Sequence, residues 1–223
     1  MKTLAYLATL IATTLSLAGA AQEQAPEPDT RPGVVKDYGD FDLDQWVYDE
    51  KRVAVGWSEK FPNANELVQT RGMGTAAYPR DLQFRDGAIE CDMAGGAYLG
   101  ISFRIREVDG ERLSEDVYFR ISGNQRPQTV QYYPHGTLKQ EELHRPPYER
   151  PIRLIEQDEW FHVRIEVQGR QARVFLDDSR DPVQVIEDLM HDHADGSVGV
   201  RSWGGRFANL KVTLTEPADN PAR

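Results

Sequence analysis

The chain contains almost no cysteine, since Cys91 is the only one among its 223 residues. A single cysteine excludes an intrachain disulfide, so the fold does not rely on such a bridge. Cys91 lies in residues 88–93, where apolar and acidic residues alternate, and this pattern predicts that it points into the core as a small hydrophobic side chain. A reactive thiol is typical of cationic surroundings, whereas the neighbours Glu90 and Asp92 are acidic.

Basic residues are also scarce. Lysine and arginine number 26 against 36 aspartates and glutamates, and the net charge is −10. Binding to nucleic acid or to anionic membranes needs a basic footprint, so neither partner is expected. The chain also lacks a phosphate loop, a dinucleotide fingerprint and a nucleophile elbow, and it shows no repeat with a period of about 20 to 50 residues.

The only long uncharged stretch of apolar and small residues is at the N-terminus. Lys2 precedes residues 4–17, which carry no charge, and Ala18-Gly19-Ala20 has the small-x-small pattern that a signal peptidase accepts. A spanning helix needs about 20 strongly apolar residues, and this stretch is shorter and contains Thr, Ser and Gly. Residues 1–20 are therefore expected to be a signal peptide, and the mature protein is expected to be periplasmic or secreted, with no membrane span.

The remainder divides into one domain with two polar flanks. Residues 21–37 are Pro-rich, polar and free of aromatics, which predicts a disordered leader, and residues 215–223 predict a flexible tail. Residues 38–214 predict a single domain.

Hydrophobicity in that domain alternates with a period of two. Residues 99–106, 116–122, 161–167 and 171–177 each place apolar side chains on one face and polar ones on the other, as the strands of a half-exposed antiparallel sheet do. Hairpin turns are predicted at Asp109-Gly110, at Gly123-Asn124 and at Gln168-Gly169-Arg170. Only residues 183–191 predict a short helix or an irregular strand. The pattern indicates an all-β fold with two antiparallel sheets.

Several segments resemble the concanavalin A-like lectin/glucanase superfamily. They are residues 160–167 (Trp-Phe-His-Val-Arg-Ile-Glu-Val), residues 172–177, residues 196–201 and residues 206–212. Asp42-Leu43-Asp44-Gln45-Trp46 further resembles the opening of the 3-keto-disaccharide hydrolase-like family of secreted bacterial domains. The resemblance covers roughly residues 38–214 and implies a jelly-roll sandwich and a carbohydrate partner.

In that superfamily, one sheet is concave and its solvent-side residues form the saccharide site. If residues 99–106, 116–122 and 128–133 line this face, aromatic rings would cover the apolar side of a sugar, and polar groups would bind its hydroxyls. Arginines add recognition of a carboxylate or sulfate, which favours an anionic saccharide. The alternative is an ordinary solvated face on which these arginines pair with acids. The candidates are Arg104, Asp116, Tyr118, Arg120, Gln131 and Tyr133, joined from a neighbouring strand by Arg201 and Trp203.

Residues 134–159 form an insertion rich in Pro, Arg and Glu. A connection of this length is usually functional or disordered. We expect it either to wall one end of the saccharide groove or to be a mobile edge loop.

Catalysis has weaker support in the sequence. Glycoside hydrolysis needs two carboxylates about 5 to 10 Å apart, and the Glu-x-Asp-x-Glu-like cluster of the superfamily's glucanases is absent. The resemblance to the hydrolase-like family implies a polar residue, often His, where this chain has Trp203, and this difference favours binding. The alternatives are a glycoside hydrolase or lyase and a structural or protein-interaction module.

No cofactor is expected. A structural calcium ion has suitable oxygen ligands in Asp177-Asp178 with Asp181, or in Asp192 with Asp195.

The predicted cleavage site can be tested on exported material. Protein recovered from the periplasm or medium should begin at Ala21 and contain no disulfide, because a small-residue site precedes Ala21 and Cys91 is alone. Intact mass and N-terminal sequencing measure both properties. Exported protein that retains Met1 would contradict the prediction.

Overall fold

The computed structural model describes residues 33–70, 77–121, 127–138, 140–192 and 194–215. Among these residues, no helix is long and apolar enough to cross a membrane. The two helical elements are short 3-10 turns, η1 (Leu43–Gln45) and η2 (Gln140–Leu143). The strands are β1 (Val34–Asp37), β2 (Trp46–Val47), β3 (Val53–Trp57), β4 (Asn65–Gln69), β5 (Tyr78–Pro79), β6 (Gly87–Ala94), β7 (Tyr98–Val108), β8 (Glu111–Arg120), β9 (Thr129–His135), β10 (Glu149–Pro151), β11 (Phe161–Gln168), β12 (Gln171–Leu176), β13 (Gln184–Ile186), β14 (Ser197–Ser202) and β15 (Arg206–Leu214).

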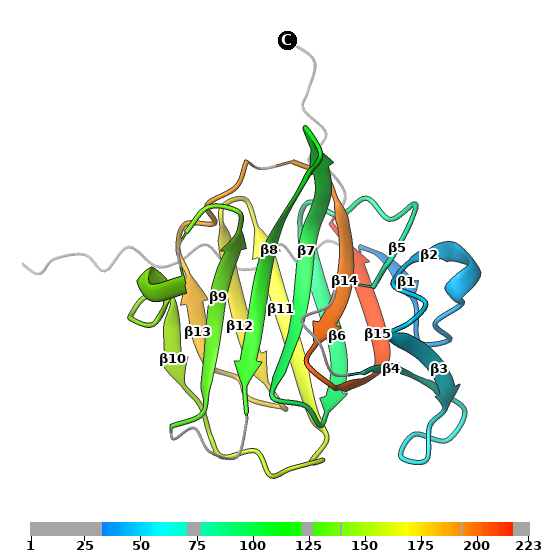
Figure 1. Ribbon diagram of the computed structural model, residues 1–223. Coiled ribbons are helices and arrows are strands. Elements are labelled where there is room, and N and C mark those ends of the chain that lie inside the picture. The colour runs from blue at the N-terminus through cyan, green and yellow to red at the C-terminus, as the bar shows by residue number, and fades with distance from the viewer. Residues whose placement is uncertain (1–32, 71–76, 122–126, 139, 193, 216–223) are drawn as a thin grey trace, which may run out of the picture. The chain divides into compact units, whose positions relative to one another are not determined.

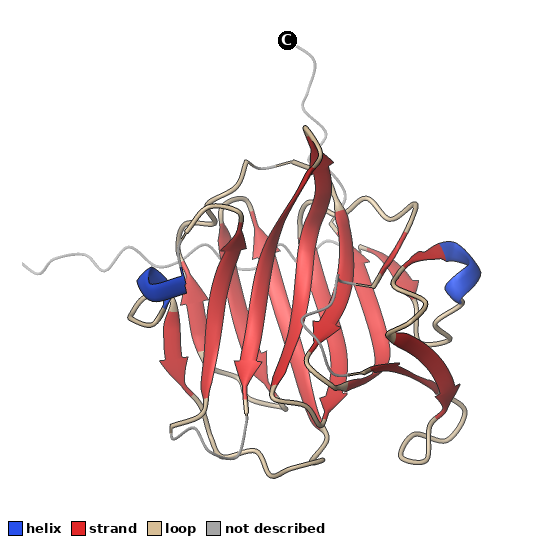
Figure 2. Cartoon of the chain, viewed as in Figure 1, coloured by secondary structure: helices blue, strands red, loops and turns tan. Residues whose placement is uncertain are grey.

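The strands form two main antiparallel sheets that stack face to face. A five-stranded sheet has the order β10-β9-β8-β7-β14 and lies nearer the viewer in Figure 1. Behind it lies an eight-stranded sheet, β13-β12-β11-β6-β15-β4-β3, in which β1 also pairs with β15. β2 and β5 make a separate small sheet, and the 3-10 turns lie at opposite sides of the sandwich (Figure 2). The predicted all-β, two-sheet jelly-roll sandwich is confirmed.

The core lies between the two sheets and is built by the alternation seen in the sequence. Leu99, Ile101 and Phe103 of β7 are fully buried, and so are Ile89, Cys91 and Met93 of β6. Successive side chains of a strand point to opposite faces, so every second residue enters the core. The prediction that Cys91 points inward is confirmed, and burial raises the pKa of its thiol.

The alternation fails at one place in β7. Phe103 pairs with Glu115 and Arg106 with Leu113, so two residues of β7 stand opposite one residue of β8. Arg104, in this β-bulge, has a φ of 53° and is fully buried. A bulge re-aims a side chain because the extra residue breaks the two-residue period. The prediction that Arg104 lies on the outer face is therefore wrong.

The buried Arg104 ties the two sheets together. Its Nε donates to the carbonyl oxygen of Arg85 at 3.0 Å, and its Nη2 donates to the carbonyl oxygen of Gly169 at 2.6 Å. Nη2 also lies 3.2 Å from Oδ1 of Asp86. These partners lie just before β6 and in the turn between β11 and β12, so Arg104 has a structural role.

The domain begins earlier than expected. Val34–Asp37, which the sequence assigns to a disordered leader, form β1 along the C-terminal half of β15. The segment 183–191 contains the three-residue strand β13 followed by irregular chain. The predicted signal peptide, the turn at Gly123-Asn124 and most of the predicted tail lie outside the described residues.

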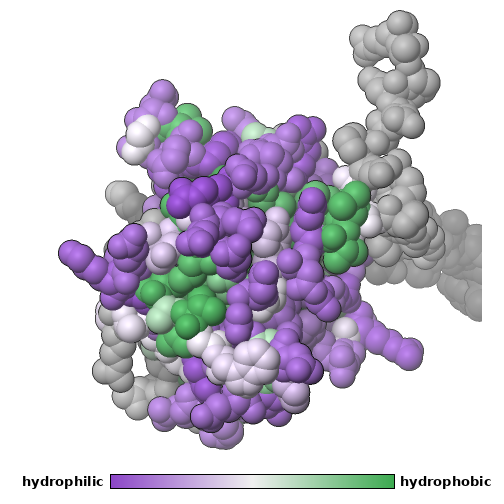
Figure 3. Space-filling model, turned by 90° about the vertical axis from the view of Figure 1, so that its right-hand side faces the viewer, coloured by the Kyte–Doolittle hydropathy of each residue, from purple (hydrophilic) through white to green (hydrophobic). Residues whose placement is uncertain are grey.

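The edge of the sandwich at the right of Figure 1 is mostly hydrophilic, with separate hydrophobic patches (Figure 3). β1 and β3 of the eight-stranded sheet carry exposed apolar side chains, with Val35 60% and Trp57 67% exposed. Trp57 lies on the eight-stranded sheet, so replacing it removes an exposed tryptophan without changing the five-stranded sheet.

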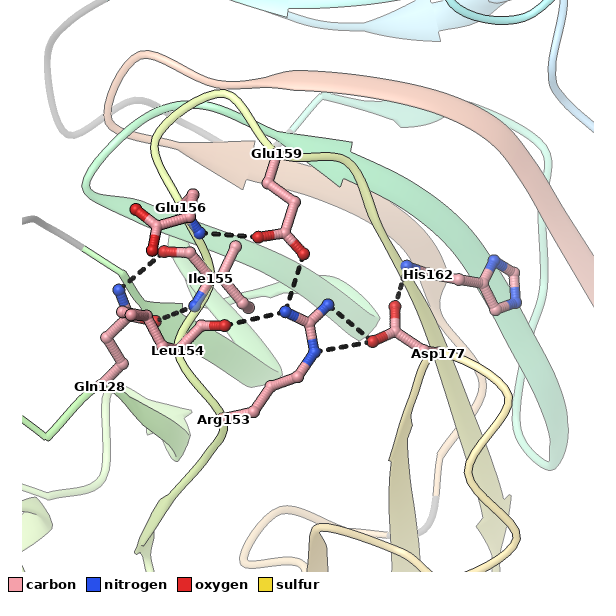
Figure 4. Close-up of polar contacts among 8 residues, drawn as sticks. All are labelled: Gln128, Arg153, Leu154, Ile155, Glu156, Glu159, His162 and Asp177. Carbon is pink, nitrogen blue, oxygen red and sulfur yellow. Dashed lines mark hydrogen bonds and ion pairs between the residues drawn. The ribbon is translucent and has the colours of Figure 1, made fainter.

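The predicted insertion is partly regular structure. It contains η2 and β10, and the chain that follows is fastened by Arg153, which binds Oδ2 of Asp177 through Nε and Nη2 and Oε1 of Glu159 through Nη1 (Figure 4). Gln128 donates to the carbonyl oxygen of Ile155 and accepts from its N–H. The Arg153 contacts fasten the end of the insertion to the turn after β12, and the Gln128 contacts fasten it to the start of β9.

The burial of Cys91 predicts its reactivity. A thiol reagent should label the native protein very slowly and the denatured protein at once, because the sulfur lies between the sheets and its thiolate is disfavoured by burial. Mass spectrometry after timed labelling measures this. Rapid labelling of native protein would show that the strand register is misassigned.

Candidate functional site

The outer face of the five-stranded sheet gathers polar and aromatic side chains from all of its strands. Because one face of each strand is buried in the core, the alternate residues must lie on this side. Antiparallel pairing aligns them in three rows, which we call together the polar face. One row is Arg201, Gly100, Tyr118, Gln131 and Glu149; the second is Gly199, Ser102, Asp116 and Tyr133; the third is Tyr98, Arg120 and Thr129.

Asp116 organises the centre of the polar face. Its Oδ1 accepts from Oγ of Ser114 at 2.8 Å. Its Oδ2 accepts from the hydroxyl of Tyr118 at 3.2 Å and from Nη1 of Arg201 at 2.9 Å. Asp116 is fully buried, so this carboxylate is matched by an arginine and two hydroxyls, as a buried charge requires.

The ring of Tyr118 lies flat across β7. A Cβ on Gly100 would come within 2.7 Å of Cδ1 of Tyr118, so the absence of a side chain at Gly100 makes room for the ring. The guanidinium of Arg201 lies 5.2 Å from the centroid of the same ring, within the range of a cation–π interaction. Burial, and then the nearby Asp116, raise the pKa of the Tyr118 hydroxyl well above its usual value, so this hydroxyl is a donor at neutral pH.

A second ion cluster lies toward β10. Nη1 of Arg120 is 3.2 Å from Oε1 of Glu149 and 2.8 Å from Nδ1 of His144. Oγ1 of Thr129 donates to the same Oε1 at 2.7 Å. The predicted ligand-binding residue Arg120 is therefore already paired with an acid, and its side chain is only 15% exposed.

Aromatic rings lie on both sides of these clusters. Trp203 is 42% exposed and its ring centroid is 6.3 Å from that of Tyr98, over which the guanidinium of Arg120 lies at 5.7 Å. Near β9, the centroid of Tyr133 lies 6.2 Å from that of Tyr118 and 5.8 Å from that of His135. Partly exposed aromatic rings next to fixed donors and acceptors are the combination that sugar rings require.

Two segments border the polar face. On the β14 side, a Cβ on Gly199 would lie 2.4 Å from the carbonyl oxygen of Ala77, which shows that the chain before β5 crosses closely over this strand. On the β9 side, Nε2 of Gln131 donates to the carbonyl oxygen of Leu143 at the end of η2. The insertion therefore lies beside the polar face.

His135 and Arg112 lie at the end of the face near the β7–β8 turn. His135 pairs with Ser114 in the ladder, and Arg112 is two residues before Ser114 on the same side of β8. Burial lowers the pKa of His135; the cations Arg112 and Arg201 act in the same direction, and Asp116 opposes them. The imidazole is therefore neutral at pH 7.

The structure brings together seven of the eight residues predicted from the sequence; Arg104 is the exception. Sequence reasoning missed Tyr98, Ser114, Arg112 and Glu149. The first three share the parity of predicted residues on β7 and β8, so extending the same alternation would have found them. Glu149 has no such signal, because only the pairing of β10 with β9 places it beside Gln131.

The two predicted calcium positions contain carboxylates with other partners. Asp177 is bound by Arg153, and both oxygens of Asp195 accept from Arg85 at 2.8 Å. Within the ranges that the structure describes, no group of three or more His, Cys, Asp or Glu side chains is arranged to hold a metal ion.

Comparison with known proteins finds likeness in structure only. No family model matches the chain, and no curated protein matches it. Among solved structures, the carbohydrate binding module CBM66 from Bacillus subtilis has a TM-score of 0.51 at 13% identity, over 75% of this chain and 95% of that chain. A protein of unknown function with a galectin-like fold from Bacillus subtilis has a TM-score of 0.54 at 10% identity, over 78% and 91%. A putative glycosyl hydrolase from Parabacteroides distasonis has a TM-score of 0.53 at 12% identity, over 78% and 90%. These likenesses show the fold alone, a two-sheet antiparallel β-sandwich.

The contact between Gly100 and Tyr118 predicts the effect of a single methyl group. Gly100→Ala should destabilise the domain by about 1 to 3 kcal/mol, because its Cβ would also lie 2.9 Å from the backbone oxygen of Val117. Gly56→Ala is the matched control, since a Cβ at Gly56 meets nothing within 4 Å, and it should be neutral or stabilise by up to about 1 kcal/mol. Urea unfolding measures both, and equal effects would show that Tyr118 does not lie over Gly100.

Proposed function

We propose that this protein is an exported carbohydrate-binding domain whose polar face holds an anionic saccharide. The observation that carries the proposal is the side-by-side placement of exposed or half-exposed rings with fixed polar groups across one sheet. Trp203 and Tyr98 offer a surface for the apolar side of a sugar ring, and the partly exposed Tyr133, Arg120 and Glu149 offer polar groups for its hydroxyls.

The fold neighbours support this proposal by analogy. One of them is a carbohydrate binding module, and another is described by its galectin-like fold. Because one fold hosts many functions, the polar face carries the proposal and the likeness in fold only supports it.

The finer resemblance, to the 3-keto-disaccharide hydrolase-like family, is also part of the proposal. Its motif at residues 42–46 has a structural explanation here. Oδ1 of Asp42 accepts from the N–H of Asp44 at the start of η1, and Trp46 is 1% exposed and packs against Phe41. The resemblance at residues 42–46 therefore supports an architecture shared with that family rather than a shared reaction.

A glycoside hydrolase or lyase is the second candidate, because His135, His144 and two carboxylates lie on or beside the polar face. Hydrolysis requires a protonated acid of raised pKa and a second free carboxylate. Asp116 accepts from Arg201, and Glu149 lies beside Arg120. Both carboxylates are thus engaged with arginines and neither is a free second carboxylate, so the arrangement favours binding over hydrolysis.

A glycan array with a paired release assay tests the proposal. We expect the mature protein to bind acidic glycans without releasing reducing ends or unsaturated uronates. Release of either product would establish the enzyme. Binding to no glycan, together with capture of a protein partner, would establish an interaction module.

Trp203→Ala tests whether the polar face is the binding surface. It should weaken glycan binding by about 1 kcal/mol or more, roughly fivefold in Kd, because an aromatic anchor of the sugar is lost. Its effect on stability should stay within about 0.5 kcal/mol, as for other surface substitutions. Trp57→Ala removes an even more exposed tryptophan from the other sheet and should leave binding unchanged. Isothermal titration calorimetry measures the glycan affinity of both variants. Equal losses of affinity would place the glycan-binding site elsewhere.

A further inference from the structure

We infer that the acid group of the bound saccharide, a carboxylate or a sulfate ester, is held at the end of the polar face by Arg112 and His135, and that its binding is coupled to uptake of a proton by His135. This inference rests on the proposed function. It assigns the anionic group to two residues that the sequence did not suggest, and it assigns a different role to Arg120.

The other arginines near the polar face already have partners. Arg120 is paired with Glu149, Arg201 with Asp116, and Arg104 is buried between the sheets. A saccharide acid group that bound Arg120 or Arg201 would compete with a carboxylate that is already in place. These arginines therefore position acids and rings, and they offer little free positive charge.

Arg112 is different. Among the described residues, no acid lies within salt-bridge distance of it, although Glu107 stands opposite it in the ladder between β7 and β8. Its Nε and Nη1 are covered and have no hydrogen-bond partner. Nε and Nη1 are thus two donors that lack acceptors among the described residues, and an anion would supply such acceptors.

Two further polar atoms of the same sheet have no hydrogen-bond partner. Nδ1 of His135 is covered and unpaired, and so is the hydroxyl of Ser102, a residue that is only 1% exposed. Ser102 pairs with Asp116 in the ladder, and Asp116 pairs with Tyr133, two residues from His135. Arg112 and His135 thus leave polar atoms without partners at one end of the polar face, and Ser102 leaves one in its central row, whereas Asp116 is saturated by Ser114, Tyr118 and Arg201.

The groups that face His135 make it sensitive to a ligand's charge. Arg112 and Asp116 come from β8, Arg201 from β14 and His191 from the chain between β13 and β14; all four act electrostatically on the ring. Burial disfavours the charged ring most, two of these four groups are cations, and the single acid is shared with Arg201, so the imidazole is neutral without ligand. A bound anion adds negative charge and favours the imidazolium.

The sign of the pH effect follows. Because the anion raises the pKa of His135, the complex holds more protons than the free protein. Affinity for acidic saccharides should therefore rise as pH falls through the pKa of the complex and level off below that of the free protein. Each unit by which the anion raises the pKa gives at most a tenfold gain in affinity.

The first experiment follows the imidazole resonances by NMR during pH titrations, with His135 assigned from His135→Gln. The probes are D-glucuronate and D-glucose 6-sulfate, with D-glucose as the neutral control. We expect at least one acidic probe to raise the pKa of His135 while leaving that of His162, on the other sheet, unchanged. The two acidic probes distinguish a carboxylate ligand from a sulfate ester. No shift of His135 by either probe, or an equal shift with glucose, would overturn the inference.

Matched variants test the role of Arg112. Arg112→Gln should abolish the shift of the pKa of His135, and Arg112→Lys should restore part of it, since lysine keeps the charge but loses the planar fork. Arg180→Gln removes the same charge from an exposed site between β12 and β13 and should have no effect. If an acidic probe shifts the pKa of His135 equally in Arg112→Gln, the assignment of the anion to Arg112 is overturned. If Arg112→Gln does not fold, the size of the shift in Arg112→Lys tests the same assignment.

The outcomes separate this inference from the proposed function. If the glycan array shows binding of neutral glycans only and neither acidic probe shifts His135, the saccharide-binding face stands and the acid-group site fails. If an acidic probe shifts His135 through Arg112 but no glycan binds, the anion site stands and the saccharide proposal fails. Tighter binding of an acidic glycan at pH 5.5 than at pH 7.5, lost in His135→Gln, supports both.

Discussion

The stacking of two sheets is the constraint on which the rest of this structure depends. Each strand of the five-stranded sheet must bury one face against the eight-stranded sheet, and the two-residue period then places every other side chain on the outer face. Leu99 and Ile101 are buried for this reason, and Tyr98 and Tyr118 lie outside for the same reason. The polar face is therefore a geometric consequence of how the core is made.

Charge pairing gives this face its internal order. Asp116 is buried on a surface that would otherwise be solvated, and it is matched by Arg201, Ser114 and Tyr118. Glu149 and Arg120 form an equivalent pair nearer β10. Removing one partner from a buried pair leaves an uncompensated charge, so these pairs hold rings and hydrogen-bonding groups in fixed positions. Arg112 belongs to neither pair, unlike Arg120 and Arg201.

The β-bulge in β7 shows how a local irregularity changes the role of a residue. Arg104 has the parity of an outer residue, and its sequence neighbours Ser102 and Arg106 do not reveal the break. The bulge forms where Arg104 binds Arg85, Asp86 and Gly169, which come from two other parts of the chain. Such partners lie far away in sequence, so no pattern within residues 99–106 predicts them.

The alternation in the sequence determined the fold class, the buried position of Cys91 and six of the eight residues expected on the polar face, because burial of one strand face is a local property with a period of two. The tertiary structure decided which arginines are free. That choice depends on contacts between strands β8 and β10, on the approach of the chain before β5 to β14, and on the bulge at Arg104. Each of these brings together residues that are distant in sequence, and the energy of a charge depends on the groups around it in space.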